Sequence, residues 1–226
     1  MMTTIRKALT ILIVFLMTAS LKGQEKDFGI WYGANLNKGI SNRLDLNVSV
    51  MARTYEDASK LEQAFAEAGI SYKIKKGLDA AISYRLTDAA EDDSKFYVQH
   101  KIFLDLKGDT KVSRFTLSAR LRFQTRMKTY LVYYSDKYPD YTGRIKLKAS
   151  YRTQNFPVNP YVYYEAFCPM FSKDNSRTIG KNRVCAGIEY KISSKHSIDI
   201  GYIYQRDYLP KIKDMNIIDL EYNLKL

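Results

Sequence analysis

The segment from Thr110 to Met127 alternates apolar and cationic side chains, and this pattern restricts the fold more than any other feature of the chain. One parity carries the apolar residues Phe115, Leu117, Ala119, Leu121 and Phe123. The other parity carries the polar residues Arg114, Thr116, Ser118, Arg120, Arg122, Gln124 and Arg126. Because side chains alternate across a strand with a period of two, the segment predicts one long β-strand. Globular strands have about 5–6 residues, whereas a tilted strand that crosses a bilayer needs about 9–11.

The same alternation recurs along the rest of the chain. It is found at 28–37, 44–53, 63–74, 78–86, 96–106, 144–152, 161–167, 183–192, 198–205 and 218–226. The pattern predicts an all-β chain that forms a single antiparallel up-and-down transmembrane β-barrel of roughly 10–12 strands. Bacterial single-chain barrels usually have an even number of strands. Either the segment around Trp31 lies outside the barrel, which gives ten strands, or the tyrosine-rich stretch 130–134 hides a twelfth.

The connections between these segments alternate in length. Short joins are predicted near 38–42, 75–77, 107–110, 153–159 and 193–196. Longer, polar joins are predicted near 55–62, 87–95, 128–143, 169–182 and 206–214. Short periplasmic turns and longer external loops are typical of outer-membrane barrels, so the alternation favours that class over a soluble sandwich.

The N-terminus has the features of a secretory signal peptide. Arg6 and Lys7 precede an uncharged apolar run that ends at Met17, and small residues follow. The run is too short for a spanning helix, which needs about 20 apolar residues. We therefore expect a cleaved signal peptide at 1–23, a barrel domain at 24–226, and export to the cell outer membrane. No cysteine follows the apolar run closely, so a lipoprotein anchor is not expected.

The chain is basic, with a formal net charge of +12, and its charges are sorted by strand. Two strands carry an inward basic wall of Arg114, Arg120, Arg122, Arg126, Arg144, Lys146, Lys148 and Arg152. The last four strands carry an inward acidic wall of Glu165, Glu189, Asp199, Asp219 and Glu221. A basic balance is common in nucleic-acid-binding proteins, but here it follows one parity of exported strands. A charged lumen is therefore predicted, and a nucleic-acid partner is not.

Three functions remain open for such a barrel. We favour a largely filled lumen, in which Arg120 and Arg122 lie within salt-bridge reach of acids such as Glu165 and Glu189. The alternative is a porin-like pore for small hydrophilic solutes that prefers anions. A second alternative is a structural or partner-binding barrel that acts through its tyrosine-rich external loops.

No residue pattern predicts an active site. His100 shares the apolar parity of its strand, and His196 lies at a turn, without an acid and a nucleophile at recognisable spacing. The chain lacks metal-ligand spacing and a glycine-rich phosphate loop, so neither an enzyme nor a cofactor is expected. Cys168 and Cys185 flank one loop and could form a disulfide, although the predicted strand parity places them on opposite faces.

Several segments together resemble the DUF2490 family. They are DFGIWYG, ISYKIKKGLDAAISYR, FTLSARLRFQTR, YVYYEAF and KNRVCAGIEYKISSKHSIDIGYIYQ, spread over residues 27–226. The resemblance implies a β-barrel in a Gram-negative outer membrane and supplies no activity and no functional residues. The expected partners are outer-membrane lipid and the barrel-assembly machinery, whose recognition signal the terminal strand resembles, although it ends in Leu226 instead of an aromatic residue.

Overall fold

The computed structural model describes residues 26–92, 95–130, 137–171, 179–209 and 211–226. The predicted signal peptide lies outside these residues. The described residues form eleven strands: β1 (Lys26–Gly39), β2 (Leu44–Tyr55), β3 (Lys60–Lys75), β4 (Leu78–Asp92), β5 (Lys95–Val112), β6 (Phe115–Lys128), β7 (Asp140–Tyr151), β8 (Val158–Met170), β9 (Lys181–Lys191), β10 (His196–Asp207) and β11 (Lys213–Lys225). In the same residues no helix is long and apolar enough to span a bilayer.

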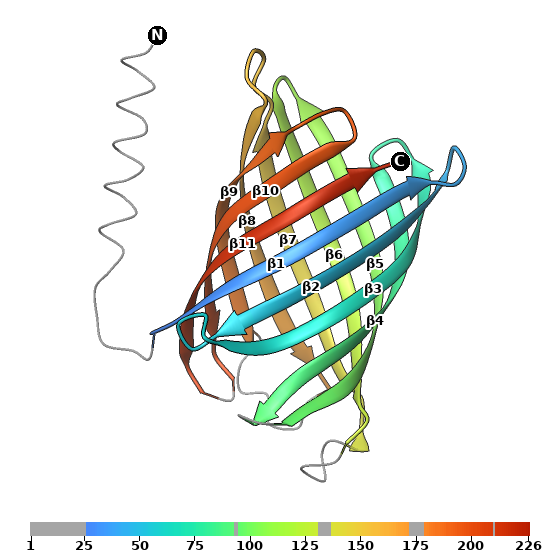
Figure 1. Cartoon of the computed structure of the whole chain (residues 1–226). Helices are drawn as coiled ribbons and strands as arrows, with labels where there is room; N and C mark the ends of the chain where they lie inside the picture. The colour runs from blue at the N-terminus through green and yellow to red at the C-terminus, as the bar shows by residue number, and fades with distance from the viewer. Residues whose placement is uncertain (1–25, 93–94, 131–136, 172–178, 210) are drawn as a thin grey trace.

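The strands close into one barrel in which each strand pairs with its neighbours in sequence (Figure 1). All pairs are antiparallel except the closing pair, β1 with β11, which is parallel. The segment around Trp31 is β1 and completes the wall, so ten strands is wrong. The other alternative was a twelfth strand at 130–134. This stretch lies largely outside the described residues, and the eleven described strands already form a closed order. An odd count places the start of β1 and the end of β11 at opposite ends of the barrel.

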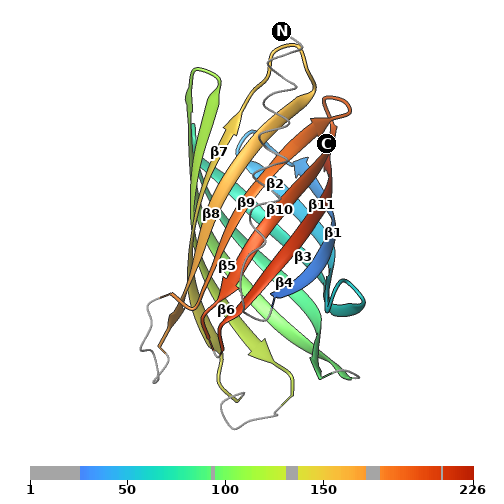
Figure 2. The same cartoon turned by 90° about the vertical axis from the view of Figure 1, so that its left-hand side faces the viewer.

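The loops are sorted less strictly than the sequence predicts. The joins predicted near 55–62 and 87–95 are correctly placed but too long, because β3 already begins at Lys60 and β4 extends to Asp92. Their polar residues have the composition of a loop but continue the strand ladder, as the Gln63–Ala89 pairing shows. The turn predicted at 107–110 falls instead at 113–114, where Ser113 adopts a positive φ. The two longest connections follow β6 and β8, and these two strands end at the same end of the barrel, opposite the short turn between β5 and β6 (Figure 2).

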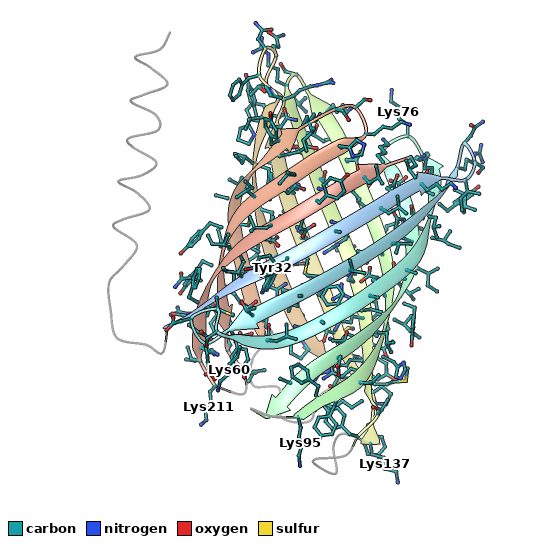
Figure 3. The ribbon with its side chains drawn as sticks, in the orientation of Figure 1. Tyr32, Lys60, Lys76, Lys95, Lys137 and Lys211 are labelled. Carbon is teal, nitrogen blue, oxygen red and sulfur yellow. The ribbon has the colours of Figure 1, made fainter. Side chains whose placement is uncertain are left out.

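Apolar side chains cover the outer wall. On the predicted apolar parity, Leu117, Leu121 and Ile200 are 44%, 52% and 43% exposed. Large exposed apolar residues of this kind occur on almost every strand, among them Val50, Ile70, Ile82, Leu104, Ile145, Val162 and Val184. Lysines lie at the two ends: Figure 3 places Lys60, Lys95, Lys137 and Lys211 at the loop end and Lys76 at the turn end. An apolar belt between two charged rims matches a bilayer, because a soluble monomer rarely exposes so large an apolar surface.

The interior of the barrel holds an apolar cluster as well as charged side chains. A buried cluster lies in the lumen beside β1 and β8–β11, and its members are Trp31, Tyr161, Cys185, Ile203, Met215 and Ile217. Ile203 and Ile217 have no exposed surface, and they face each other across β10 and β11. Charged side chains surround this cluster, and some of them, such as Arg183 and Asp219, are buried.

Candidate functional site: a charged lumen with two vestibules

Arginine and aromatic side chains form a layer across the middle of the barrel. We call it the arginine–aromatic layer, and its members are Trp31, Arg53, Phe65, Arg85, Phe103, Arg122, Arg144, Phe167 and Arg183. Each guanidinium carbon lies between 3.7 and 5.1 Å from a ring centroid. Arg183 contacts both Phe167 and Trp31, so the contacts run around the interior. Such cation–π contacts are strongest where water is excluded.

Carboxylates compensate most of this positive charge. Arg122 donates two hydrogen bonds of 2.6 Å to Asp105, its cross-strand neighbour. The side chain of Glu165 is 3% exposed, and its Oε1 accepts 2.8 Å hydrogen bonds from both Arg120 and Arg144. Its Oε2 lies 3.9 Å from Arg183. Glu165 therefore interacts with three arginines, and these interactions offset the free-energy cost of burying its charge.

These contacts match the salt bridges predicted from sequence only in part. Arg120 does reach Glu165, as expected for a filled lumen. Arg122 pairs with Asp105 instead, because these two residues lie directly opposite each other on adjacent strands. Glu189 makes neither predicted bond: it accepts a 2.8 Å hydrogen bond from Asn159.

A cavity of about 580 Å³ lies on the turn side of the layer, and we call it the turn-end vestibule. It brings together five residues of the predicted basic wall, Arg114, Arg120, Lys146, Lys148 and Arg152, with Glu189 and Asp199 of the acidic wall. Lys107, Lys111 and Lys191 add three more cations. Its lining is thus strongly cationic. Arg114 belongs to a turn, so it and Arg152 mark the mouth and not the strand wall.

A second cavity, of about 420 Å³, lies on the loop side, and we call it the loop-end vestibule. Its cations are Arg53, Arg85, Lys101, Arg126, Arg144, Lys181 and Arg183, and its acids are Glu62 and Asp140. Arg126 pairs with Asp140 at its rim, and Lys181 pairs with Asp207 at 2.7 Å. Among the described residues, Arg53 and Lys101 have no carboxylate within salt-bridge distance.

No described residue lines both vestibules. The layer, Glu165 and the apolar cluster lie between them. Asp219 and Glu221, the last members of the predicted acidic wall, line neither cavity. Asp219 is 9% exposed and lies opposite Trp31 in the parallel seam, while Glu221 accepts a 2.6 Å hydrogen bond from Asn35.

The possible disulfide between Cys168 and Cys185 is not formed, and both cysteines are free. The strand ladder explains why. Cys168 continues β8 as the partner of Gly143 and lines an outer groove, whereas Cys185 is buried inside the barrel. Their side chains therefore point to opposite faces of the wall.

The histidines lie outside the lumen. His100 shares a hydrogen bond of 2.5 Å with the Tyr84 hydroxyl, and His196 shares one of the same length with Tyr222. Both tyrosines are exposed on the outer wall. In the part of the chain that the structure describes, no group of three His, Cys, Asp or Glu side chains could hold a metal ion.

Sequence reasoning missed much of the arginine–aromatic layer. Its aromatic members lie on the polar parity of their strands, as Phe65 lies with Glu67 and Phe103 with Asp105. An aromatic residue flanked two positions away by a charged residue is the signal that marks them, since both side chains then face the lumen. Arg53, Arg85 and Arg183 share that parity.

No curated protein matches this chain. Among solved structures, the NanC porin matches with 12% identity and a TM-score of 0.53, over 83% of this chain and 90% of that one. The β-domain of the Bordetella autotransporter BrkA matches with 10% identity and a TM-score of 0.45, over 74% and 78%. The likeness to the porin concerns the fold alone, a closed β-barrel. The family profile "Protein of unknown function (DUF2490)" matches residues 28–216, and the chain belongs to this family.

Proposed function

We propose that the protein is an outer-membrane barrel that gives small hydrophilic anions a narrow route, with the arginine–aromatic layer as its constriction. The observation that carries the proposal is the pair of cationic vestibules that approach the same layer from opposite ends. Cations outnumber acids in both linings, and side-chain charge at close quarters sets the selectivity of a pore. The likeness in fold to a porin supports the same class of function.

The layer itself would make the passage restrictive. Its arginines are held by Asp105, Glu67 and Glu165, so an anion must compete with carboxylates to pass. Arg53 is the exception: among the described residues it donates a hydrogen bond to the Met51 sulfur and contacts the rings of Trp31 and Phe65, but no carboxylate lies within salt-bridge distance. The guanidinium of Arg53, beside Trp31, therefore offers a passing anion a binding position between the two vestibules. We therefore expect a low conductance.

Planar-bilayer recording tests this proposal. The inserted barrel is expected to give small current steps whose reversal potential under a salt gradient indicates anion preference. Lys101→Glu, which places a negative charge in the loop-end vestibule, should weaken that preference. Lys76→Glu is the matched control, because Lys76 lies in an exposed turn outside both cavities. If the barrel is verified to have inserted and no current steps are recorded, the result would instead favour a filled barrel that acts as a structural or partner-binding protein.

Location is tested by fractionation. The processed protein should be recovered with outer membranes and should migrate faster on gels before boiling than after it. The reason is that a closed barrel has no free strand edge and keeps its compact shape in detergent. Recovery as a soluble periplasmic protein would contradict the proposal.

A further inference from the structure

Three like charges lie side by side on the wall of the turn-end vestibule. Lys107 of β5 is directly opposite Arg120 of β6, which is directly opposite Lys146 of β7. Lys148, the next inward residue of β7, faces the same cavity. Like charges at opposed positions destabilise a sheet. Lys107 lies 3.5 Å from the carboxylate of Asp109, and Arg120 donates to Glu165, so these two cations have partners. Lys146 and Lys148 are the two that need compensation from other groups in the lumen.

The carboxylates near Lys146 and Lys148 do not supply this compensation. Glu165 is the cross-strand neighbour of Lys146, but its oxygens are engaged by arginines. The two acids of the vestibule belong to the opposite wall, where Glu189 and Asp199 accept hydrogen bonds of 2.8 and 2.9 Å from asparagine side chains. In the described residues neither Lys146 nor Lys148 has a carboxylate within salt-bridge distance.

Aromatic rings hold these two lysines in place instead. The Lys146 ammonium lies 3.6 Å from the centroid of the Tyr163 ring, and that of Lys148 lies 4.0 Å from the centroid of Tyr161. The Tyr161 ring occupies space left by Gly187, where a Cβ would come within 2.7 Å of it. A fixed ammonium loses little freedom when it binds a ligand, so the pair is preorganised.

Arg120 adds a third donor. One of its terminal nitrogens donates to Glu165, whereas its Nε is buried without a hydrogen-bond partner. Arg120, Lys146 and Lys148 thus place three cationic side chains from β6 and β7 around one cavity. Ser118 lies directly opposite Lys148 and also lines the cavity.

We infer that Arg120, Lys146 and Lys148 bind the phosphate group of a small phosphate monoester. A phosphate dianion offers several acceptor oxygens and a charge near −2, which compensates two lysines better than one carboxylate does. The opposite wall suits a hydroxylated organic part, because Asn159 and Glu189 provide polar groups there. A cavity of about 580 Å³ lies within the range of small-molecule sites. The inference rests on the proposed function for its solute class, but not on passage through the layer.

Calorimetry on the detergent-solubilised protein purified from outer membranes tests the site. Glucose 6-phosphate is expected to bind, and glucose is not. Lys148→Gln and Lys146→Gln should each weaken binding about tenfold, because each removes one charge-assisted hydrogen bond. Lys101→Gln is the matched control: it removes a lysine without a carboxylate partner from the other vestibule and should leave binding unchanged.

The outcomes separate the site from the pore. Binding that is lost in both turn-end variants and kept in Lys101→Gln supports the site, even if bilayers stay silent and the proposed function fails. Equal binding of glucose and glucose 6-phosphate, or loss only in Lys101→Gln, overturns the site, even if anions are conducted. Heat-modifiable migration of every variant verifies that the barrel has folded. If a lysine-to-glutamine variant fails this check, Lys148→Arg, which keeps the charge, must retain binding, and its failure to do so also overturns the site.

Discussion

Replacing Glu165 by Gln is expected to destabilise the folded barrel by about 3–5 kcal/mol, which is typical when one partner of a buried ion pair is removed. The change leaves Arg120 and Arg144 without their shared acceptor charge in an interior where isolated charges are costly. Urea unfolding in lipid vesicles measures the effect. Trp31, the only tryptophan, lies in the arginine–aromatic layer and reports the transition through its fluorescence.

Glu189→Gln is the matched control for this prediction. The side chain of Glu189 is 35% exposed, and its nearest cation, Lys191, lies 3.9 Å away. A partly exposed pair of this kind is worth about 0–1 kcal/mol. Equal stability of the two variants would contradict the assignment of Glu165 as the charge that holds the layer together.

A double variant checks the cause of the loss. In the Glu165→Gln background, Arg144→Gln removes one of the cations left unpaired. The double variant should therefore be more stable than the sum of the two single losses predicts, as expected for residues in direct contact. Strict additivity would mean that Glu165 acts through packing and not through its charge.

The strands and their faces could be predicted because the alternation of side chains depends only on local geometry. Leu121 and Arg122 are neighbours in sequence, and the structure places one on the outer wall and the other in the layer. The parity of each strand therefore follows from the sequence alone. The parallel pairing of β1 with β11 could not be predicted in this way, because no local sequence pattern indicates which two strands close the barrel.

The sequence predicted a basic and an acidic wall in the lumen, but it did not predict most of the ion pairs between cations and carboxylates. Register decides which inward residues are opposed, and it depends on turn positions that the sequence placed wrongly. The turn at 113–114, and not at 107–110, makes Asp105 the partner of Arg122 and leaves Lys107 beside Arg120. The layer also needs residues from many strands, so its members cannot be recognised from any one segment. Because the arginine–aromatic layer separates the two vestibules, they could not be predicted from the sequence either.

The lipid-facing assignment predicts a large penalty for a charge on the outer wall. Leu121→Arg, near the middle of β6, should destabilise the barrel by about 2–4 kcal/mol in vesicles, because an arginine at the bilayer midplane must leave water without a partner. The side chain of Leu121 lies in an apolar row with Leu106 and Ile145, its direct neighbours. Ser118→Asn, on the inward face of the same strand, should change stability far less, since its side chain lines a polar cavity. Unfolding titrations of both variants in vesicles compare the two faces. Equal losses would place Leu121 away from the hydrocarbon and remove the argument that the apolar belt is the membrane surface.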